Sequence, residues 1–544
     1  MSALLFVVVL CLCAAPTDGQ ARILAVVGTV KSTSARVLLD WVEPSTSKSR
    51  VLRLDAMPFS GGAADASAAQ SASMEVTLPV NGAPRVVTVS ALTPQTLYLV
   101  AIVHDGVPLA SVSFRTRPTN ETRALLKTRV AVVSCNRIAE DGDGRGWMAL
   151  SQHEPEPHIV LHLGDQIYGD ADAKWFMRQV AAAPVADAAK LYRETVARYR
   201  ANYRATWSNP HVAFVLRRGE QWMIPDDHDF NNNLSPDMWR NATLRPMLRA
   251  GLQTVYEYQM ALRDDVPGAT EAFAKCATSG GRDDDACAAA DSVATKLTRF
   301  DVRGTTAIAM VDVRVERMVI EGDYKLVSDA HVEQVRAQFA AWRDDPAIES
   351  ILLVTAIPLV FLNPMVTRLV DEWEREFYTM HGRHEKETRQ LLDIAHDAHA
   401  RKTVTLVGGD FHMSHEADLC RAGGSCMRQF VSSGITAGSS SLRSHTLFWL
   451  YVYMWHVHHY DDGVWSMKKL NMAISPNFLV IEDGKRARAV YDISLDHIEM
   501  LWMGLWRFFP AVLALVVVVL MLLCVFLSLK RQPTAATTPA KKSQ

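Results

Sequence analysis

The chain has almost no net charge and no long basic segment. Its 57 Lys and Arg residues nearly balance its 59 Asp and Glu residues, which leaves a formal charge of −2 at pH 7. A protein that binds nucleic acid concentrates positive charge on one face, and here no run of more than a few basic residues occurs. The composition therefore argues against nucleic acid as a binding partner. The sequence also lacks internal repeats, and its 544 residues are enough for several domains.

Charged residues are missing from two apolar segments at the ends of the chain. Residues 3–15 precede Pro16-Thr17-Asp18-Gly19, a pattern that predicts a signal peptide over residues 1–19, although no Lys or Arg precedes the run. The uncharged run 508–529 is long enough, at ~1.5 Å per residue, to cross a hydrocarbon core of ~30 Å. Basic residues follow it, so the positive-inside rule predicts a cytosolic tail over residues 530–544. We therefore expect a single-pass type I protein of the plasma membrane or of a secretory or endolysosomal membrane, with its main part extracellular or lumenal.

Cysteine is scarce, with eight residues, of which two lie in the predicted signal peptide and one in the predicted membrane helix. The others form two close pairs and one isolated residue: Cys276 with Cys287, Cys420 with Cys426, and Cys135. We expect the two pairs to be local disulfides in an oxidising compartment, although four cysteines permit three pairings. Cys135 then remains unpaired, either as a metal ligand or as a buried structural thiol. Glycosylation sequons at Asn120 and Asn241 fit the same compartment.

Apolar and polar residues alternate between residues 20 and 118, which is typical of strands with one buried face. The expected strands are 36–41, 50–54, 74–78, 85–89, 98–104 and 110–116. The turn at 92–98 resembles the corner of a fibronectin type III-like domain, in which a tyrosine hydroxyl, here that of Tyr98, ties back to upstream backbone. We predict a fibronectin type III-like β-sandwich over residues 20–118.

Four short apolar runs each end in residues that can bind metals. They lie at 130–136, 158–170, 222–229 and 404–412. The carboxyl ends of parallel strands meet at one edge of an α/β sheet, so these residues should lie close together. Their thiol, carboxylate, phenol and imidazole groups suit a trivalent metal such as iron beside divalent cations. A single Gly-Asp is equally well explained as a turn, but four such strand ends predict a metal centre.

The identity and order of these motifs resemble the PhoD-type alkaline phosphatases, a branch of the calcineurin-like metallophosphoesterases. The resemblance rests on Ser-Cys-Asn at 134–136, Gly-Asp-Gln-Ile-Tyr at 164–168, Asp-Asp-His-Asp at 226–229, Val-Asp-Val-Arg at 311–314, Gly-Asp-Phe-His at 409–412 and Ser-Ser-Gly-Ile-Thr at 432–436. Cys135 is distinctive, because most of the superfamily has a carboxylate and a histidine at the first strand end. The chain departs from the family pattern at Asp229, where glutamate is common, and at Val311, where leucine is more usual.

The resemblance implies a catalytic domain over residues 124–492, an α/β fold in which a metallophosphoesterase two-sheet sandwich is flanked by helices. Helical stretches expected at 187–204, 331–343 and 371–401 agree with this layering. The implied metal ligands are Cys135, Asp165, Tyr168 and His412 for ferric iron (Fe3+), and Asp165, Asp227 and Asp410 for calcium (Ca2+). Other divalent metals would also suit the second group.

The implied reaction is hydrolysis of phosphate mono- or diesters by in-line attack of a metal-bound hydroxide, without a phosphoenzyme. His228 is the expected donor of a proton or hydrogen bond to the leaving oxygen, with orientation of Asp227 as a nearly equal alternative. Arg314 is the candidate ligand for the substrate phosphate, with a salt bridge to Asp312 or Glu316 as the alternative.

Aromatic residues near the predicted membrane helix favour a membrane-proximal substrate. The segment 447–465 is rich in Trp and Tyr, and Trp502 and Trp506 are placed for the membrane interface. A lipid or glycolipid phosphoester is therefore the substrate hypothesis. The alternative function is a non-enzymatic cell-surface receptor or adhesion protein that retains the fold. Loss of a metal ligand would indicate that alternative, and no ligand is lost.

Overall fold

The computed structural model describes residues 23–43, 49–59, 70–119, 127–138, 144–182, 187–320, 324–361, 379–380, 382–436, 459–473 and 477–491. The predicted signal peptide, membrane helix and cytosolic tail lie outside these residues, as do Asn120 and most of the aromatic segment 447–465. Within the ranges just given, no helix is both long and apolar enough to span a membrane.

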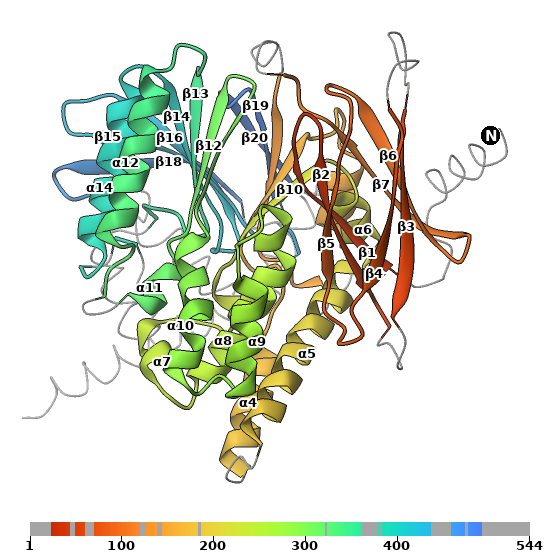
Figure 1. Ribbon diagram of the computed structural model, residues 1–544. Coiled ribbons are helices and arrows are strands. Elements are labelled where there is room, and N and C mark those ends of the chain that lie inside the picture. Colours follow the sequence, from red (N-terminus) through yellow and green to blue (C-terminus); the bar gives the residue numbers. More distant parts are fainter. Residues whose placement is uncertain are drawn as a thin grey trace, which may run out of the picture. The chain divides into compact units, whose positions relative to one another are not determined.

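The described residues between 23 and 115 form two antiparallel sheets that pack face to face (Figure 1). The first contains β1 (Ile23–Val30), β2 (Ala35–Trp41) and β5 (Arg85–Val89). The second contains β4 (Ala72–Leu78), β3 (Arg50–Pro58), β6 (Leu97–His104) and β7 (Val107–Arg115). Side chains from both sheets form one apolar core, in which Val37 of β2 joins Leu54 of β3 and Val100 of β6. The predicted β-sandwich is therefore present.

The alternation in the sequence located six of these strands but missed β1, because all eight of its residues are buried. One face of β1 belongs to the core of the β-sandwich, whereas Leu24 and Val26 pack into a core shared with the strands Arg129–Val133 and Ile159–Leu163. A strand that is buried on both faces shows no alternation. The tyrosine corner is confirmed, because the Tyr98 hydroxyl accepts a hydrogen bond from the Thr93 amide at 2.9 Å and donates one to the Gln70 carbonyl at 2.9 Å.

Two further sheets form the second part of the fold. The smaller has the order β10-β9-β8-β19-β20, with bounds β8 (Arg129–Val133), β9 (Ile159–Leu163), β10 (Glu220–Ile224), β19 (Asn477–Glu482) and β20 (Arg486–Tyr491). The larger has the order β11-β12-β13-β14-β16-β15-β18-β17, with bounds β11 (Arg299–Arg303), β12 (Thr306–Val311), β13 (Ser350–Thr355), β14 (Thr403–Gly408), β15 (Ser414–Arg421), β16 (Cys426–Ser432), β17 (His459–Asp461) and β18 (Trp465–Ala473). The strands β8, β9 and β10 are parallel, and so are β12, β13, β14 and β16. Apolar residues of both sheets, such as Leu161 and Val354, form one core between them.

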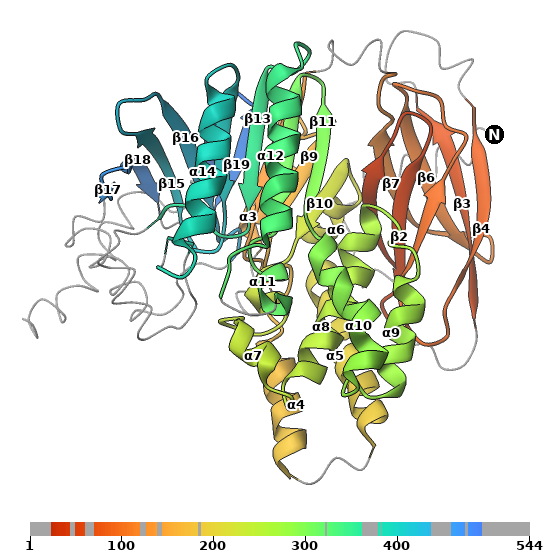
Figure 2. The same cartoon turned by 60° about the vertical axis from the view of Figure 1, so that its left-hand side comes forward.

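Helices cover the outer faces of both sheets. The larger sheet is covered by α12 (Asp329–Asp344) and α14 (Glu385–His399), which lie side by side in Figures 1 and 2. The smaller sheet packs against α3 (Arg145–Ser151), α5 (Ala188–Trp207) and α6 (Pro210–Leu216). A separate apolar core joins helices that include α4 (Asp170–Ala182), α7 (Pro236–Arg240), α8 (Arg245–Tyr258), α9 (Ala269–Thr278), α10 (Asp284–Asp291) and α11 (Glu316–Val319). The expected mixed α/β fold of packed sheets and flanking helices is confirmed.

Both local cysteine pairs are disulfides. Cys276 of α9 is bonded to Cys287 of α10, and Cys420 of β15 to Cys426 of β16. Of the cysteines that the structure describes, Cys135 is the free one, and it is buried.

Candidate metal centre

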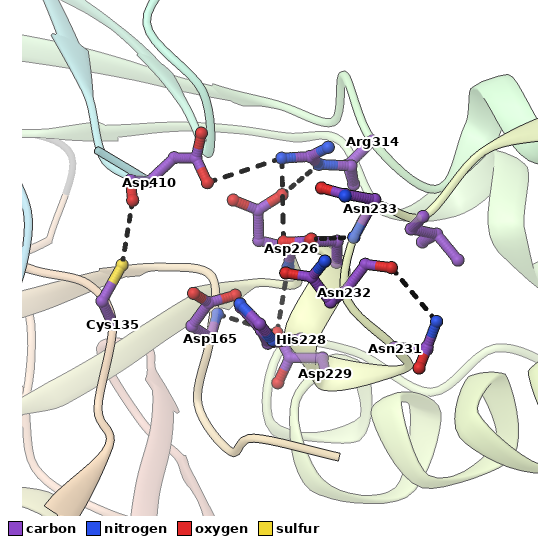
Figure 3. Close-up of polar contacts among 12 residues, drawn as sticks. Cys135, Asp165, Asp226, His228, Asp229, Asn231, Asn232, Asn233, Arg314 and Asp410 are labelled. Carbon is purple, nitrogen blue, oxygen red and sulfur yellow. Dashed lines mark hydrogen bonds and ion pairs between the residues drawn. The ribbon is translucent and has the colours of Figure 1, made fainter. Parts of the chain in front are cut away.

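Four strand ends from the two packed sheets meet at one place (Figure 3). Cys135 follows β8, and Asp165 and Tyr168 follow β9. The turn after β10 continues into a short 3-10 helix, η3 (Asp227–Asp229). The turn after β14 carries Asp410 and His412. The structure therefore brings together the metal ligands expected from the sequence.

The donor atoms form three overlapping groups, in each of which they lie within 4.8 Å of one another. The groups are Cys135 with Asp165 and His412, Asp165 with Asp227 and His228, and Asp226 with Asp227 and Asp410. Tyr168 joins the first group, because its hydroxyl oxygen lies 3.0 Å from Nε2 of His412. Shared carboxylates are how proteins hold neighbouring metal ions, and here Asp165 and Asp227 each belong to two groups. Sequence reasoning had given no ligand role to Asp226.

The carboxylates at this site fit metal ions, because several of their oxygens have no hydrogen bond. Asp165 is 1% exposed, and neither of its oxygens accepts a hydrogen bond. One carboxylate oxygen of Asp226 and one of Asp227 are also buried and accept no hydrogen bond. Burying an ionised carboxylate without a partner is strongly unfavourable, and bound cations are an ordinary way to compensate it. The thiol, imidazole and phenol of the first group extend this donor set toward a trivalent ion.

The protonation of the site is set by burial and by crowding of acidic groups. Burial and, next, the charge of Asp410 raise the pKa of the Cys135 thiol to about 12. Burial and the neighbouring Cys135 raise the pKa of Asp165 well above its usual range. Burial lowers the pKa of His412 to about 4, so its imidazole is neutral at pH 7. Metal binding would therefore displace protons from Cys135 and Asp165, whereas His412 is already in the ligand form.

The backbone at the ligand turns is held in an uncommon conformation. The φ angles are 60° at Cys135, 52° at Asp165, 69° at Asp410 and 50° at His412, all in the left-handed region. A residue other than glycine costs ~1–3 kcal/mol there, so such conformations persist where surrounding structure enforces them. Their concentration in one place is characteristic of a functional site.

Asp229 supplies part of that enforcement, and sequence reasoning missed its role. Its carboxylate lies 3.0 and 3.1 Å from the amide nitrogens of Asp165 and Gln166, and 2.9 Å from that of Asp226. The remaining donors are the Tyr203 hydroxyl at 3.3 Å and the Gln259 side-chain amide at 3.0 Å. One buried carboxylate thus joins the ligand turns after β9 and β10. Only its place in the motif at 226–229 drew attention to it in the sequence.

Cys135 is held by hydroxyl groups. Its sulfur lies 3.0 Å from the hydroxyl oxygen of Ser134 and 3.0 Å from that of Ser433. Ser433 belongs to the loop 432–436, which the sequence analysis included among its motifs. The Ile435 amide also donates to the Ser134 carbonyl at 3.0 Å, which fixes this loop beside the first strand end.

His228 lies at the more open side of the site. Its side chain is 18% exposed, and Nδ1 lies 2.7 Å from a carboxylate oxygen of Asp170, a partner that sequence reasoning missed. Its ring centre is 4.2 Å from that of Tyr168. Burial alone would lower the pKa of His228, but Asp165, Asp227 and Asp170 raise it to about 10. This position is compatible with donation to a leaving group and with support of Asp227, and its role stays a prediction.

Arg314 points into the carboxylates and not toward solvent (Figure 3). Its side chain is 0% exposed, its Nε donates to Asp226, and Nη2 lies 3.7 Å from Asp227 and 3.5 Å from Asp410. Asp312, the alternative partner in the sequence analysis, instead accepts hydrogen bonds from backbone amides at positions 314–316. Arg314 therefore balances the negative charge of the site, and its contact with a substrate phosphate stays a prediction.

Comparisons with known proteins agree with this site. A family model described as PhoD-like phosphatase matches residues 130–273. Among solved structures, the fold is similar to that of PhoD, with a TM-score of 0.57 and 12% identity over 88% of this chain and 87% of that chain. No curated protein matches the chain.

Two smaller likenesses have TM-scores too low to support an argument. The sensor domain of the anti-sigma factor RsgI4 from Pseudobacteroides cellulosolvens has 15% identity over 19% of this chain and 100% of its own, with a TM-score of 0.15. An fn3 domain of human collagen alpha-1(XX) has 19% identity over 20% of this chain and 91% of its own, with a TM-score of 0.13.

The family match begins in β8 and ends in α9, so it includes Cys135, Asp165, Tyr168 and Asp227. Because this segment contains three of the four strand ends of the metal centre, the match concerns the residues that bear the chemistry. The family match and the shared fold together support a PhoD-type phosphatase, and so an enzyme that hydrolyses phosphoesters.

Proposed function

We propose that the protein hydrolyses phosphate mono- or diesters at a centre of ferric iron and calcium while anchored in a membrane. The observation that carries this proposal is the buried Asp165 carboxylate, which has no hydrogen bond and lies between two groups of metal-binding side chains. Cys135, Asp165, Tyr168 and His412 would hold the iron, and Asp165, Asp227 and Asp410 would hold calcium together with Asp226. When bound, these ions would lower the pKa of a water molecule and neutralise charge on the phosphoryl group.

The residues of the chain prepare this chemistry in two ways. Burial acts to raise the pKa of Asp227, but Arg314 and His228 lower it overall, so Asp227 is ionised and ready to bind a cation. His228 is oriented by Asp170 and is partly open to solvent, where it would donate to the leaving oxygen. The Asp229 carboxylate holds the turns after β9 and β10 together, because it accepts hydrogen bonds from backbone amides of both turns.

The cellular setting belongs to the same proposal. The signal peptide at 1–19 and the membrane helix at 508–529 stay predictions, and the two disulfides support an oxidising compartment. A site close to a membrane would suit a lipid or glycolipid phosphoester. The β-sandwich would be a fibronectin type III-like domain that supports the catalytic domain, because its strand β1 packs against the catalytic strands.

Metal content and hydrolysis of the full-length protein in detergent test the core of the proposal. The wild type should contain about one iron ion per chain together with calcium, and should hydrolyse p-nitrophenyl phosphate or bis-p-nitrophenyl phosphate. The variant Cys135→Ala should lose iron, because it lacks the thiolate ligand. A well-folded wild type without stoichiometric metal, even after purification with metals supplied, would contradict the proposal.

A second assay tests the membrane substrate. The full-length protein is placed in vesicles, and its rates are compared on a phosphoester held in the same vesicles and on a soluble phosphoester with the same leaving group. A preference for the vesicle-held substrate is expected. Equal rates on both would remove the lipid part of the proposal and leave the hydrolase part intact.

A further inference from the structure

Phosphoester substrates carry negative oxygens that need positively charged partners besides the metal ions. Arginine is well suited to this task, because its planar guanidinium can donate two parallel hydrogen bonds to a phosphate. Arg314, the residue expected for this role, is completely buried against three carboxylates. A substrate that reached it would first have to separate those contacts.

Arg137 is more exposed than Arg314. It follows Cys135 by two residues on the turn after β8, and its side chain is partly exposed. Its guanidinium carbon lies 5.3 Å from the centre of the Tyr168 ring, which belongs to the iron group of donors. Cation and ring at this distance attract each other, so the contact helps to orient the guanidinium beside the metal centre.

Arg137 also lies near a second candidate ligand. Its guanidinium packs on the Tyr168 ring, and the hydroxyl oxygen of Tyr168 lies 3.0 Å from Nε2 of His412. A phosphoryl group that met the metals on this side would also meet Arg137.

We propose that Arg137 binds the phosphoryl oxygens of the substrate and of the product phosphate. This inference rests on the proposed function and adds a residue that recognises the charged group. The alternative is a purely structural role, in which Arg137 packs on Tyr168 and supports the metal centre without contacting the substrate. The two roles differ in what they do to metal content and to phosphate binding.

Binding of inorganic phosphate to the metal-loaded, full-length protein separates these roles. Isothermal titration calorimetry is carried out on the wild type, Arg137→Met and Arg137→Lys, with elemental analysis of each sample. A hydrogen-bonded charge contributes enough that Arg137→Met should weaken phosphate binding about 10- to 100-fold at unchanged metal content. Arg137→Lys should lose less phosphate affinity, because lysine keeps the positive charge but cannot donate two parallel hydrogen bonds. For a phosphate monoester, KM should rise in Arg137→Met by a larger factor than kcat falls.

Arg218→Met is the matched control. Arg218 is also partly exposed, and its guanidinium carbon lies 3.9 Å from the centre of the Phe214 ring, just before β10 and so at the opposite end of that strand from the metal centre. This variant should bind phosphate like the wild type.

Three results would overturn the inference. Unchanged phosphate affinity in Arg137→Met with full metal content would remove Arg137 from substrate binding. Loss of metal in both Arg137 variants would assign it to support of the metal centre. A metal-loaded wild type that neither binds phosphate nor hydrolyses phosphoesters would refute the proposed function itself, and the inference with it.

Discussion

Two regions of this molecule bury acidic side chains, and they treat them in opposite ways. At the contact between the β-sandwich and the catalytic sheets, the buried Glu220 is surrounded by donors. It accepts hydrogen bonds from the Val30 amide at 3.1 Å, the Trp222 indole at 3.1 Å and the Arg303 guanidinium at 3.2 Å. At the metal centre, the equally buried Asp165 accepts none.

The comparison separates stability from function. A buried acid that is fully hydrogen-bonded joins parts of the fold, and removal of its charge leaves its partners unsatisfied. A buried acid that lacks donors destabilises the metal-free protein, and it is kept where a cation will bind it. Buried acidic residues therefore have opposite expected responses to neutralisation in the two regions.

Neutralisation of Asp165 should have the largest effect on activity. Asp165→Asn removes a ligand shared by two donor groups, so hydrolysis should fall by about a thousandfold or more. Asparagine tolerates the left-handed conformation at this position, so the fold should persist. In urea unfolding with a chelator present, the variant should be as stable as the wild type or more stable. The metal-free wild type must take up a proton at the buried Asp165 when it folds, which costs free energy at neutral pH, and asparagine needs no such proton. A clear loss of stability under those conditions would make Asp165 a structural residue.

Neutralisation of Glu220 should have the opposite signature. Glu220→Gln removes one of the two countercharges of the buried Arg303, which keeps an ion pair with Asp301 at 2.9 Å. The free energy of unfolding should therefore fall by ~1–3 kcal/mol, the cost of leaving buried donors unsatisfied. Glu156→Gln is the control, because Glu156 is 54% exposed and lies 3.7 Å from Arg218, where an ion pair contributes only ~0–1 kcal/mol. Urea titration measures both. Equal stability of the two variants would show that burial does not distinguish these pairs.

Removal of the metals should destabilise the wild type but not Asp165→Asn. Ligands that bind only the folded state stabilise it, by ~2.7 kcal/mol at a hundred times the dissociation constant. A chelator should therefore lower the Tm of the wild type and of Glu156→Gln alike, whereas the Tm of Asp165→Asn should move much less. Equal shifts in all three proteins would indicate that the ions bind elsewhere.

Asp229 combines features of the two regions, because it is fully hydrogen-bonded and yet lies at the metal centre. Asp229→Asn replaces an acceptor oxygen with a donor amide opposite the backbone amides of Asp165 and Asp226, so both turns should loosen. Metal affinity should fall ~10–100-fold, as is typical when a residue that orients the ligands is changed. Asp237→Asn, at an exposed position, is the control. Weaker folding with unchanged metal affinity would limit Asp229 to a structural role.

The sequence located the residues of the candidate metal centre because each strand end has a local signal. An apolar run followed by Gly-Asp or by Ser-Cys-Asn places Asp165 and Cys135 at a strand end, and the strand ends of a parallel sheet meet. The roles of Asp229 and Arg137 have no such signal. The donors to Asp229 come from segments far apart in the chain, and the contact of Arg137 with Tyr168 depends on how two turns face each other.

The same limit of local sequence signals applies to the strands of the fold. Strands with one exposed face, such as β3 and β4, have alternating burial that the sequence displays. In β1 every residue is buried, because it lies between the β-sandwich and the catalytic core, and its pattern carried no alternation. The direction of Arg314 was also beyond sequence reasoning, since the carboxylates that attract it follow other strands.

The smallest predicted effect lies inside the β-sandwich. Tyr98→Phe removes one hydroxyl that joins the Thr93 amide to the Gln70 carbonyl, so the free energy of unfolding should fall by ~1 kcal/mol. Metal content and hydrolysis should not change, because Tyr98 lies in the core between the two sheets of the β-sandwich, whereas other residues, such as Leu24, Val30 and Asp40, contact the catalytic domain. Urea unfolding and elemental analysis of the same samples check both statements. A change in metal content in Tyr98→Phe would show that the β-sandwich acts on the metal centre, and would remove the separation between stability and function on which the comparison of Glu220 with Asp165 rests.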